Sequence, residues 1–343
     1  MSTSTSASPL ERFLRGTESN EFAAYEKEFA NRINASIRRG FKYKRKEPSI
    51  VKQVSDLLKS LEDIPDIAGG SFNLRTRTMY IHGFRSMVQF NDLGGLARRE
   101  LGDLAFVFSI VYRGMVYFQR LTINQVKKTD RDGTWHIDEK QLRLLSQFPP
   151  FTGAAGSYVG RYPHNLPNLS GCLGSYGLMD PGEFLFVGAQ DFANLLGGRH
   201  EMKRPEVLGL GDVLDHPFTL PLPPAVGSGK SLDNYRFASN TVSFSSRFLR
   251  FGIGEVTFLP PGMWDNPQAR YIKRDLAFAS EASLKRGLEQ SKDAWDVTKA
   301  LGLPYFGSDA KGFEPPPGGD FPPDYVPGPG GTGVVMVTAV IEG

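Results

Sequence analysis

An aspartate, a glutamine and a lysine mark the ends of two apolar segments of this sequence. Asp103 precedes a run of β-branched and aromatic residues that begins at Leu104, and Gln125 and Lys127 close a second run. Carboxylate and amide oxygens are ligands that hard divalent cations accept, and an ammonium group can neutralise a phosphate. Together these three side chains could hold a divalent metal ion against a phosphate group.

The two apolar runs are separated by Arg113-Gly114, and this pattern predicts a β-hairpin. Because the side chains of a strand alternate between its faces, Gln125 and Lys127 are expected on one face and Lys128 on the other. Antiparallel pairing across the turn then brings Asp103 opposite the end of the second strand. The hairpin would therefore gather the three polar side chains at one edge of a sheet.

A structural interpretation of the same residues stays open. Asp103 and Lys127 would then form an ion pair that caps the hairpin. Gln125 fits this interpretation less well, because its neutral amide needs a hydrogen-bond partner of its own. Glu100, which is expected at the opening of the same strand as Asp103, would add a second carboxylate to a site.

An amphipathic helix is predicted from Glu18 to about Arg39. Its apolar residues recur at spacings of three and four: Phe22, Tyr25, Phe29, Ile33 and Ile37. Glu26 falls among these positions and not opposite them. Because a carboxylate on a buried stripe costs free energy unless it is paired, Glu26 is either half of an ion pair at the margin of the stripe or a site carboxylate that points into a cleft.

A basic segment follows this helix. Its basic residues are Arg38, Arg39, Lys42, Lys44, Arg45 and Lys46. They are interleaved with Phe41 and Tyr43. Such a segment can neutralise the phosphates of a nucleic acid, and its aromatic rings can stack on bases. The alternative is an ordinary solvated loop.

The composition is that of an ordinary globular protein, with 343 residues of which 40% are hydrophobic and 22% are charged. The formal net charge of +3 is too small to indicate nucleic-acid binding by itself. A single cysteine, Cys172, excludes an internal disulfide and a zinc site built from thiolates. No apolar run is long enough to span a bilayer, and the polar N-terminus lacks the apolar core of a signal peptide. We therefore expect a cytoplasmic protein that does not enter a membrane.

Changes in the spacing of apolar residues along the sequence divide the chain into three parts. Residues 1–17 are expected to form a flexible tail, residues 18–198 a core, and residues 199–343 an extension that packs on the core. The core contains a helix, several strands and a further helix from Ile137 to Phe148. This order predicts an α/β or α+β fold in which helices flank a mixed β-sheet.

The C-terminal part is predicted to be rich in β-structure. Residues 240–258 contain two segments in which apolar and polar residues alternate, and each of them predicts a strand. Residues 304–331 are rich in proline and glycine and are expected to wind over the surface. The last apolar segment, Gly333 to Ile341, predicts a strand that is buried inside a sheet.

The pattern of Asp103 on one strand and Gln125-x-Lys127 at the end of the next resembles the PD-(D/E)xK superfamily of restriction-endonuclease-like phosphodiesterases. Its members carry an acidic residue on one core strand and (D/E/Q)-x-K at the end of the following strand. Many also carry a glutamate on a helix before the core, and some a glutamine on the helix after it. The matching positions are Asp103, Gln125, Lys127, Glu26 (or Glu21 or Glu28) and Gln141. The resemblance covers residues 18–190. It departs from the superfamily at Gln125, where an acid is commoner, and at Gly102, which stands where a proline is expected.

The resemblance implies a restriction-endonuclease-like core and a metal-dependent endonuclease that cleaves DNA, with defence against foreign DNA as its setting. The residues that would hold Mg²⁺ or Mn²⁺ are Asp103, Gln125 and Glu100. Lys127 would orient the attacking water or help to deprotonate it, with Glu26 as a further catalytic carboxylate. Gln141 and the basic segment 38–46 would contact the DNA.

The alternative is a protein without catalytic activity. It would be an inactive relative that binds nucleic acid, or a structural assembly protein such as a viral shell component. The segments rich in proline and glycine and the polar N-terminal tail favour the assembly protein. DNA is the expected partner under the first interpretation, and association with further copies of the chain is left open.

Overall fold

A computed structural model provides the fold. The described residues are 9–61, 63–70, 72–82, 86–113, 115–154, 163–166, 173–181, 184–203, 238–250, 253–258 and 331–342. Within these ranges, no helix combines the length and the apolar character needed to cross a membrane.

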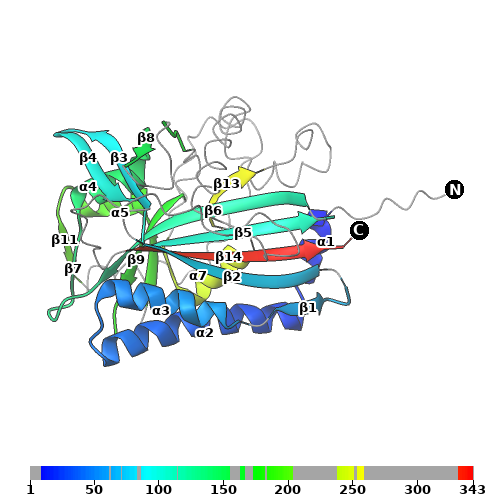
Figure 1. The fold of residues 1–343 in the computed structure, drawn as a ribbon. Coiled ribbons are helices and arrows are strands. Elements are labelled where there is room, and N and C mark those ends of the chain that lie inside the picture. Colours follow the sequence, from blue (N-terminus) through cyan, green and yellow to red (C-terminus); the bar gives the residue numbers. More distant parts are fainter. Residues whose placement is uncertain are drawn as a thin grey trace, which may run out of the picture.

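A large mixed β-sheet forms the centre of this structure (Figure 1). Its strands, in spatial order, are β1 (Ile64–Ile67), β2 (Phe72–His82), β14 (Gly331–Ile341), β5 (Leu104–Tyr112), β6 (Met115–Lys128), β9 (Gly174–Met179), β10 (Phe184–Gly188) and β12 (Ala238–Asn240). A further strand of this sheet, β13 (Glu255–Phe258), is not part of this sequence of neighbours and pairs antiparallel with β6. One smaller sheet contains β4 (Gly95–Glu100), β3 (Met87–Asp92) and β8 (Phe151–Gly153). The other contains β7 (Thr134–His136) and β11 (Glu201–Lys203).

The middle of the large sheet combines the predicted hairpin with the C-terminal strand. β5 and β6 pair antiparallel, with Leu104 opposite Asn124. On the other side of β5 lies β14, which runs parallel to β5 and antiparallel to β2. β5 is covered on both faces of the sheet, which explains why residues 104–111 are apolar at almost every position.

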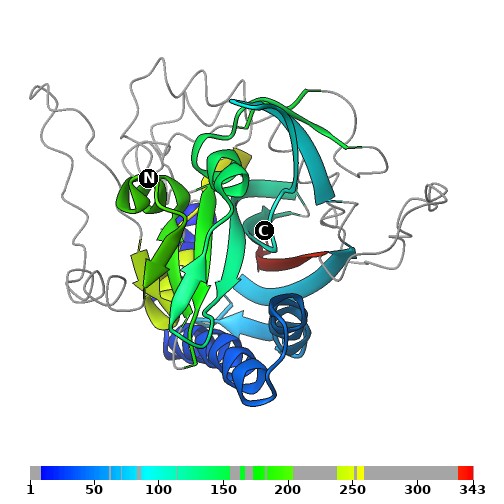
Figure 2. The ribbon, with the colours of Figure 1, turned by 90° about the vertical axis from the view of Figure 1, so that its left-hand side faces the viewer.

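Helices cover both faces of the large sheet, so the mixed sheet flanked by helices is confirmed. On one face lie α1 (Pro9–Gly16), α2 (Asn20–Lys42), α3 (Glu47–Lys59) and α7 (Thr241–Leu249). On the other face lie α4 (Glu139–Gln147) and α5 (Ala189–Leu196), together with the smaller sheets. Figures 1 and 2 show α2 and α3 side by side against the sheet, with α4 and α5 on the opposite side.

An aromatic cluster holds the α2 and α7 layer on the sheet. The ring of Phe106 on β5 lies at its centre and contacts Phe29 of α2, Phe186 of β10, and Phe244 and Phe248 of α7. The ring centroids are between 5.1 and 6.5 Å apart. Such tilted and edge-to-face contacts between buried rings stabilise beyond their burial alone.

The connection from β6 to β9 places α4 beside the end of β6. These strands are parallel neighbours, so the chain has to cross over between them. The backbone carbonyl of Leu145 in α4 approaches Gly174 of β9 so closely that any side chain at residue 174 would clash with it. Asp138 begins α4 by accepting the backbone N–H of Gln141 at 2.8 Å. The first turn of α4 is thereby fixed against the sheet.

The N-terminal boundary differs from the sequence prediction. Residues 9–16 form α1 instead of part of a flexible tail, because Phe13 is fully buried against Phe72 and Phe108. The burial of this one aromatic ring holds the segment against the sheet, although the neighbouring sequence is polar. The first part of the predicted tail, residues 1–8, lies outside the described residues.

The C-terminal part also differs. Two strands were expected within residues 240–258, but the first of them is the helix α7. Phe244 and Phe248 lie four residues apart, on one helical face, and Asn240 caps the helix by accepting a backbone N–H at 2.9 Å. The final strand forms as expected, but in the middle of the sheet. Residues 199–343 are therefore not an extension that merely packs on a separate core.

The aromatic cluster provides a test of this packing. Phe106→Ala is expected to lower the free energy of unfolding by about 3–5 kcal/mol, because it leaves a cavity between α2, α7 and the sheet. Val242→Ala on α7 is the control: Val242 is 62% exposed, and its loss is expected to change the value by less than about 0.5 kcal/mol. Urea unfolding measures both. Similar values for the two variants would contradict the central position of Phe106.

Candidate functional site

The end of β6 extends beyond its partner strand. The ladder between β5 and β6 stops before residues 125–128. Two side chains accept the backbone N–H groups there: Val126 donates to the carboxylate of Asp103 at 2.8 Å, and Lys128 donates to the carboxylate of Glu47 at 2.9 Å. A buried backbone N–H needs an acceptor. Because β5 does not reach these two N–H groups, the carboxylates of Asp103 and Glu47 accept them and lie together at the end of β6.

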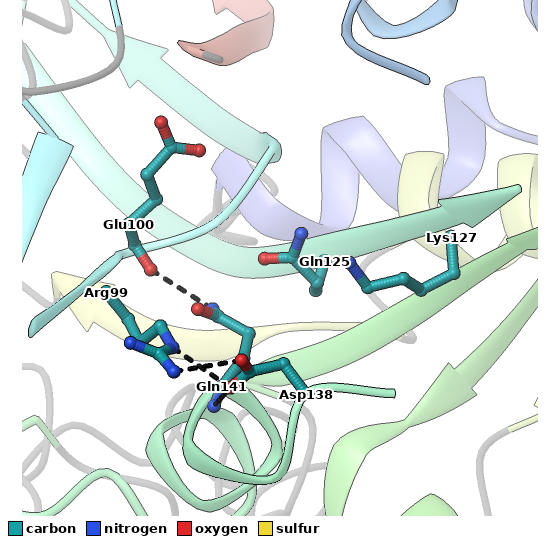
Figure 3. Close-up of a pocket in the computed structure, with 6 residues that line it drawn as sticks. All are labelled: Arg99, Glu100, Gln125, Lys127, Asp138 and Gln141. Atoms are coloured by element: carbon teal, nitrogen blue, oxygen red, sulfur yellow. Dashed lines mark hydrogen bonds and ion pairs between the residues drawn. The ribbon is translucent and has the colours of Figure 1, made fainter. Parts of the chain in front are cut away.

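Gln125 lies directly over the carboxylate of Asp103. Its Nε2 donates to the same Asp103 oxygen that accepts the N–H of Val126. Its other amide atom, Oε1, is buried and has no hydrogen-bond partner among the described residues. Figure 3 shows this side chain, which is only 6% exposed, projecting into a pocket. A buried carbonyl oxygen without a donor costs free energy, which a hydrogen-bond donor or a cation would recover.

The pocket beside Gln125 has a volume of about 200 Å³. Its lining residues are Arg99, Glu100, Gln125, Lys127, Asp138 and Gln141. Figure 3 shows the side chain of Lys127 extending back along β6 toward Gln125. The Lys127 side chain is 21% exposed, and its Nζ lies 3.8 Å from Glu47 Oε1. Asp103 does not line the pocket but lies behind Gln125.

The wall opposite β6 is built by hydrogen bonds between β4 and α4. Arg99 donates from Nε and Nη2 to the two oxygens of Asp138, each at 2.9 Å. Gln141 Nε2 donates to the backbone carbonyl of Glu100 at 3.1 Å. These bonds join the start of α4 to the end of β4, and they hold a guanidinium group at the edge of the pocket (Figure 3).

Burial dominates the electrostatics of the three carboxyl groups around Lys127. It raises the pKa of Glu100 to about 7, with Lys127 opposing the rise and Glu47 adding to it. It also raises the pKa of Asp103 well above its ordinary value, and the charge of Glu47 adds to this rise. The pKa of Glu47 is raised by burial as well, against the opposing charge of Lys127. The charges of Lys127 and, at Glu47, of Lys128 do not offset the effect of burial, so the cluster favours either bound protons or an added cation.

Five of the predicted site residues come together in the structure. Asp103 contacts Gln125, and Lys127, Glu100 and Gln141 line the pocket with Gln125. Glu100 lies at the end of β4, however, and not on the same strand as Asp103. The chain turns between them, so Glu100 approaches the pocket from the wall that faces β6.

Lys128 points to the opposite side of β6 from Lys127, as the alternation of the strand predicts. Its Nζ donates to the backbone carbonyl of Arg45 at 2.8 Å and lies 4.8 Å from the centre of the Phe41 ring. The two consecutive lysines therefore have different surroundings. Lys127 reaches the pocket, and Lys128 holds the turn between α2 and α3.

Glu26 is not brought to the pocket. It lies on α2, where its carboxylate accepts hydrogen bonds from Arg250 at 2.7 and 3.0 Å and from Ser246 at 3.2 Å. The ion-pair interpretation of Glu26 is therefore the one that the structure shows, and its assignment as a catalytic carboxylate is corrected. The other two candidates on this helix, Glu21 and Glu28, are exposed.

The basic segment lies close to the end of β6. It covers the last turn of α2 and the turn into α3, and all six basic side chains are exposed. The hydrogen bonds from Lys128 to the carbonyl of Arg45 and to Glu47 join this turn to the strand that carries Lys127. Gln141, by contrast, is 4% exposed and uses its amide N–H within the pocket wall. The structure thus shows no exposed amide nitrogen at Gln141 for contact with a nucleic acid.

Sequence reasoning missed three residues of this site: Glu47, Arg99 and Asp138. Glu47 follows the basic segment directly and precedes Pro48, a combination typical of a helix start. Asp138 falls at the start of the helix predicted from Ile137 to Phe148, but its pairing with Arg99 joins residues that are far apart in the sequence. None of these signals indicates in the sequence that the residue faces Lys127 or Gln125.

Among the described residues, no set of three or more His, Cys, Asp or Glu side chains is arranged to hold a metal ion. Comparison with known proteins finds no matching family model, and no curated protein or solved structure matches at a significant level. The function of this chain has to be inferred from the site itself.

The raised pKa of Glu100 predicts how stability depends on pH. The folded protein retains a proton on Glu100 up to about pH 7, whereas the unfolded chain releases it near pH 4.5. The free energy of unfolding should therefore fall as pH rises through this interval, by up to about 1.4 kcal/mol per pH unit from this group. Glu100→Gln is expected to flatten the profile, whereas Glu18→Gln at an exposed position leaves it unchanged. Urea unfolding between pH 4 and 8 measures this, and an equal slope in all three proteins would contradict it.

Proposed function

We propose that this protein is a metal-dependent phosphodiesterase that cleaves DNA, a divergent member of the restriction-endonuclease-like superfamily. The observation that carries the proposal is the contact of Asp103 with Gln125 behind a pocket that Lys127 also reaches. The order of elements supports it: an acidic residue opens β5, Gln-x-Lys closes β6, and α4 leads on to the parallel strand β9. The C-terminal strand β14 is a further component of this core, inserted between β2 and β5.

A divalent cation fits the side chains at the pocket. Gln125 supplies a buried carbonyl oxygen that has no hydrogen-bond donor among the described residues. Glu100 supplies a carboxyl group at the pocket whose pKa is raised by burial, whereas Asp103 lies behind the amide and accepts its hydrogen bond. Mg²⁺ prefers oxygen ligands and retains several waters, so one or two carboxylates and an amide oxygen are enough to hold it. When bound, it would neutralise charge on a phosphate and lower the pKa of an attacking water.

The residues around the pocket would then orient the substrate and stabilise charge. The ammonium of Lys127 lies where it can offset the negative charge that grows on the phosphate in the transition state. Glu47 holds this ammonium at the edge of the pocket. Asp103 orients Gln125 through its hydrogen bond, so that the carbonyl oxygen remains directed into the pocket.

The basic segment 38–46 supports DNA as the substrate. Its exposed side chains lie on the turn that Lys128 and Glu47 join to the end of β6. A phosphate backbone that passes the pocket would therefore continue over this turn and release counterions from it. Recognition of this kind is independent of base sequence.

The first test is cleavage of a supercoiled plasmid in the presence of Mg²⁺ or Mn²⁺. Lys127→Ala is expected to reduce the rate at least about 100-fold, because it removes the ammonium that stabilises the transition state. Lys128→Ala is the matched control on the opposite side of β6 and should retain most of the activity. Cleavage that persists in Lys127→Ala would overturn the assignment of the site. Binding of DNA without cleavage by the unmodified protein would instead support the non-catalytic alternative.

The second test is the salt dependence of DNA binding. The double substitution Lys44→Ala and Lys46→Ala is expected to weaken binding and to reduce the slope of log K against log salt concentration by about 1.8, since each lost phosphate contact contributes about 0.9. Lys59→Ala, at the other end of α3, serves as the control, because this lysine is also exposed. Fluorescence anisotropy at several salt concentrations measures the slope. An unchanged slope in the double variant would contradict a role of this segment in binding.

A further inference from the structure

The hairpin formed by β3 and β4 ends in an apolar tip. Asp92 pairs with Gly95, so Leu93 and Gly94 form the turn. Leu93 is 90% exposed and Leu96, on the other arm, is 60% exposed. Turns of this kind favour glycine, asparagine and aspartate, and the folding of the hairpin does not require two leucines in water.

The tip is too small to be an ordinary protein interface. Each leucine offers roughly 60–120 Å² of apolar surface. Two of them therefore supply far less than the roughly 800 Å² that each partner buries in a stable complex. Gly94 and Gly95 carry no side chains, and a Cβ at either would meet only open space. The shape is that of a narrow apolar wedge.

The hairpin leads directly out of the pocket. Arg99 and Glu100, which line the pocket, are the last residues of β4. Leu96 lies four residues before Glu100 in β4. Because a strand rises about 3.3 Å per residue, Leu96 is about 13 Å from Glu100 along the hairpin. Figure 1 shows the hairpin and the turn between α2 and α3 at the same end of the large sheet, on opposite sides of it.

Charge on the hairpin favours a polyanion. Arg98 is exposed next to the tip. The acidic residue of the tip, Asp92, is paired with Arg143, with Oδ1 2.7 Å from Nε and Oδ2 3.1 Å from Nη2. The exposed charge beside the leucines is therefore positive. A duplex that lies against the basic segment and the pocket would place its groove against this tip.

We propose that the tip of the β3–β4 hairpin is a wedge that inserts Leu93 and Leu96 into the base stack of duplex DNA. The proposal rests on the proposed function, and it specifies a base-paired substrate that is distorted when it binds. Apolar side chains that enter a groove in this way partly unstack a base step and kink the duplex. The distortion would expose the backbone of the kinked step to the pocket at the base of the hairpin.

The experiment uses the full chain with Lys127→Ala, so that the DNA stays intact, and a short duplex that contains 2-aminopurine. Binding is measured by anisotropy and unstacking by the rise in 2-aminopurine fluorescence. Adding Leu93→Ser and Leu96→Ser is expected to abolish the fluorescence rise and to weaken duplex binding about tenfold, while binding of single-stranded DNA stays the same. Leu195→Ser on α5, which replaces a leucine that is 39% exposed, is the matched control and should behave as the parent.

The other outcomes separate this inference from the proposed function. Duplex binding without a fluorescence change, or with the same change after the double substitution, overturns the wedge and leaves the nuclease proposal intact. No binding of any DNA by the parent overturns both. A shift in sedimentation caused by the double substitution would show that the tip joins copies of this chain, and it would also overturn the wedge.

Discussion

The hydrogen bond from the backbone of Val126 to the carboxylate of Asp103 is the interaction on which the site depends. It exists because β6 runs past the point where β5 begins, so the N–H groups of Val126 and Lys128, on the side of β6 that β5 would pair with, have no strand to accept them, although β9 pairs with the other side. Side chains have to satisfy these donors, since an unpaired buried N–H is costly. The carboxylate that caps β6 also orients Gln125, so the same interaction stabilises the sheet and shapes the pocket.

The contacts of Asp103 differ from those of the structural interpretation, in which it would pair with Lys127. Its carboxylate is used within the fold, but the ion pair of Lys127 is formed with Glu47 and not with Asp103. The fold gathers Asp103, Glu47 and Glu100 around the ammonium of Lys127, and burial raises the pKa of each carboxyl group. A cluster of this kind is unfavourable for folding unless protons or cations are bound, and perturbed groups beside a pocket are a feature typical of functional sites.

The position of the pocket follows from the packing of the whole sheet. Helices on one face and α4 with the smaller sheets on the other enclose β5 and β6 over most of their length. In β6, residues 118–126 are buried, whereas Lys127 and Lys128 at its end reach solvent. α4 closes this end through the pairing of Asp138 with Arg99, and the turn between α2 and α3 approaches it from the opposite face. Two segments that are far apart in the sequence thereby flank one pocket.

The sequence by itself determined the features that depend on local pattern. The apolar runs around Arg113 are sufficient for the hairpin of β5 and β6, and strand alternation separates Lys127 from Lys128. The spacing of Phe22, Tyr25 and Phe29 is sufficient for α2. These elements form from contacts between residues close in the chain, which is why periodicity reveals them.

Only the tertiary structure decided which distant residues meet. The spacing that placed Glu26 among apolar positions was correct, but its partner Arg250 directly follows α7, far away in the sequence, so no local signal distinguished an ion pair from a site carboxylate. Glu47 reaches Lys127 because α3 packs beside the end of β6. The C-terminal strand lies at the centre of the sheet because it pairs with both β2 and β5. Long-range pairing of this kind depends on how whole elements pack, and that information is spread over the entire chain.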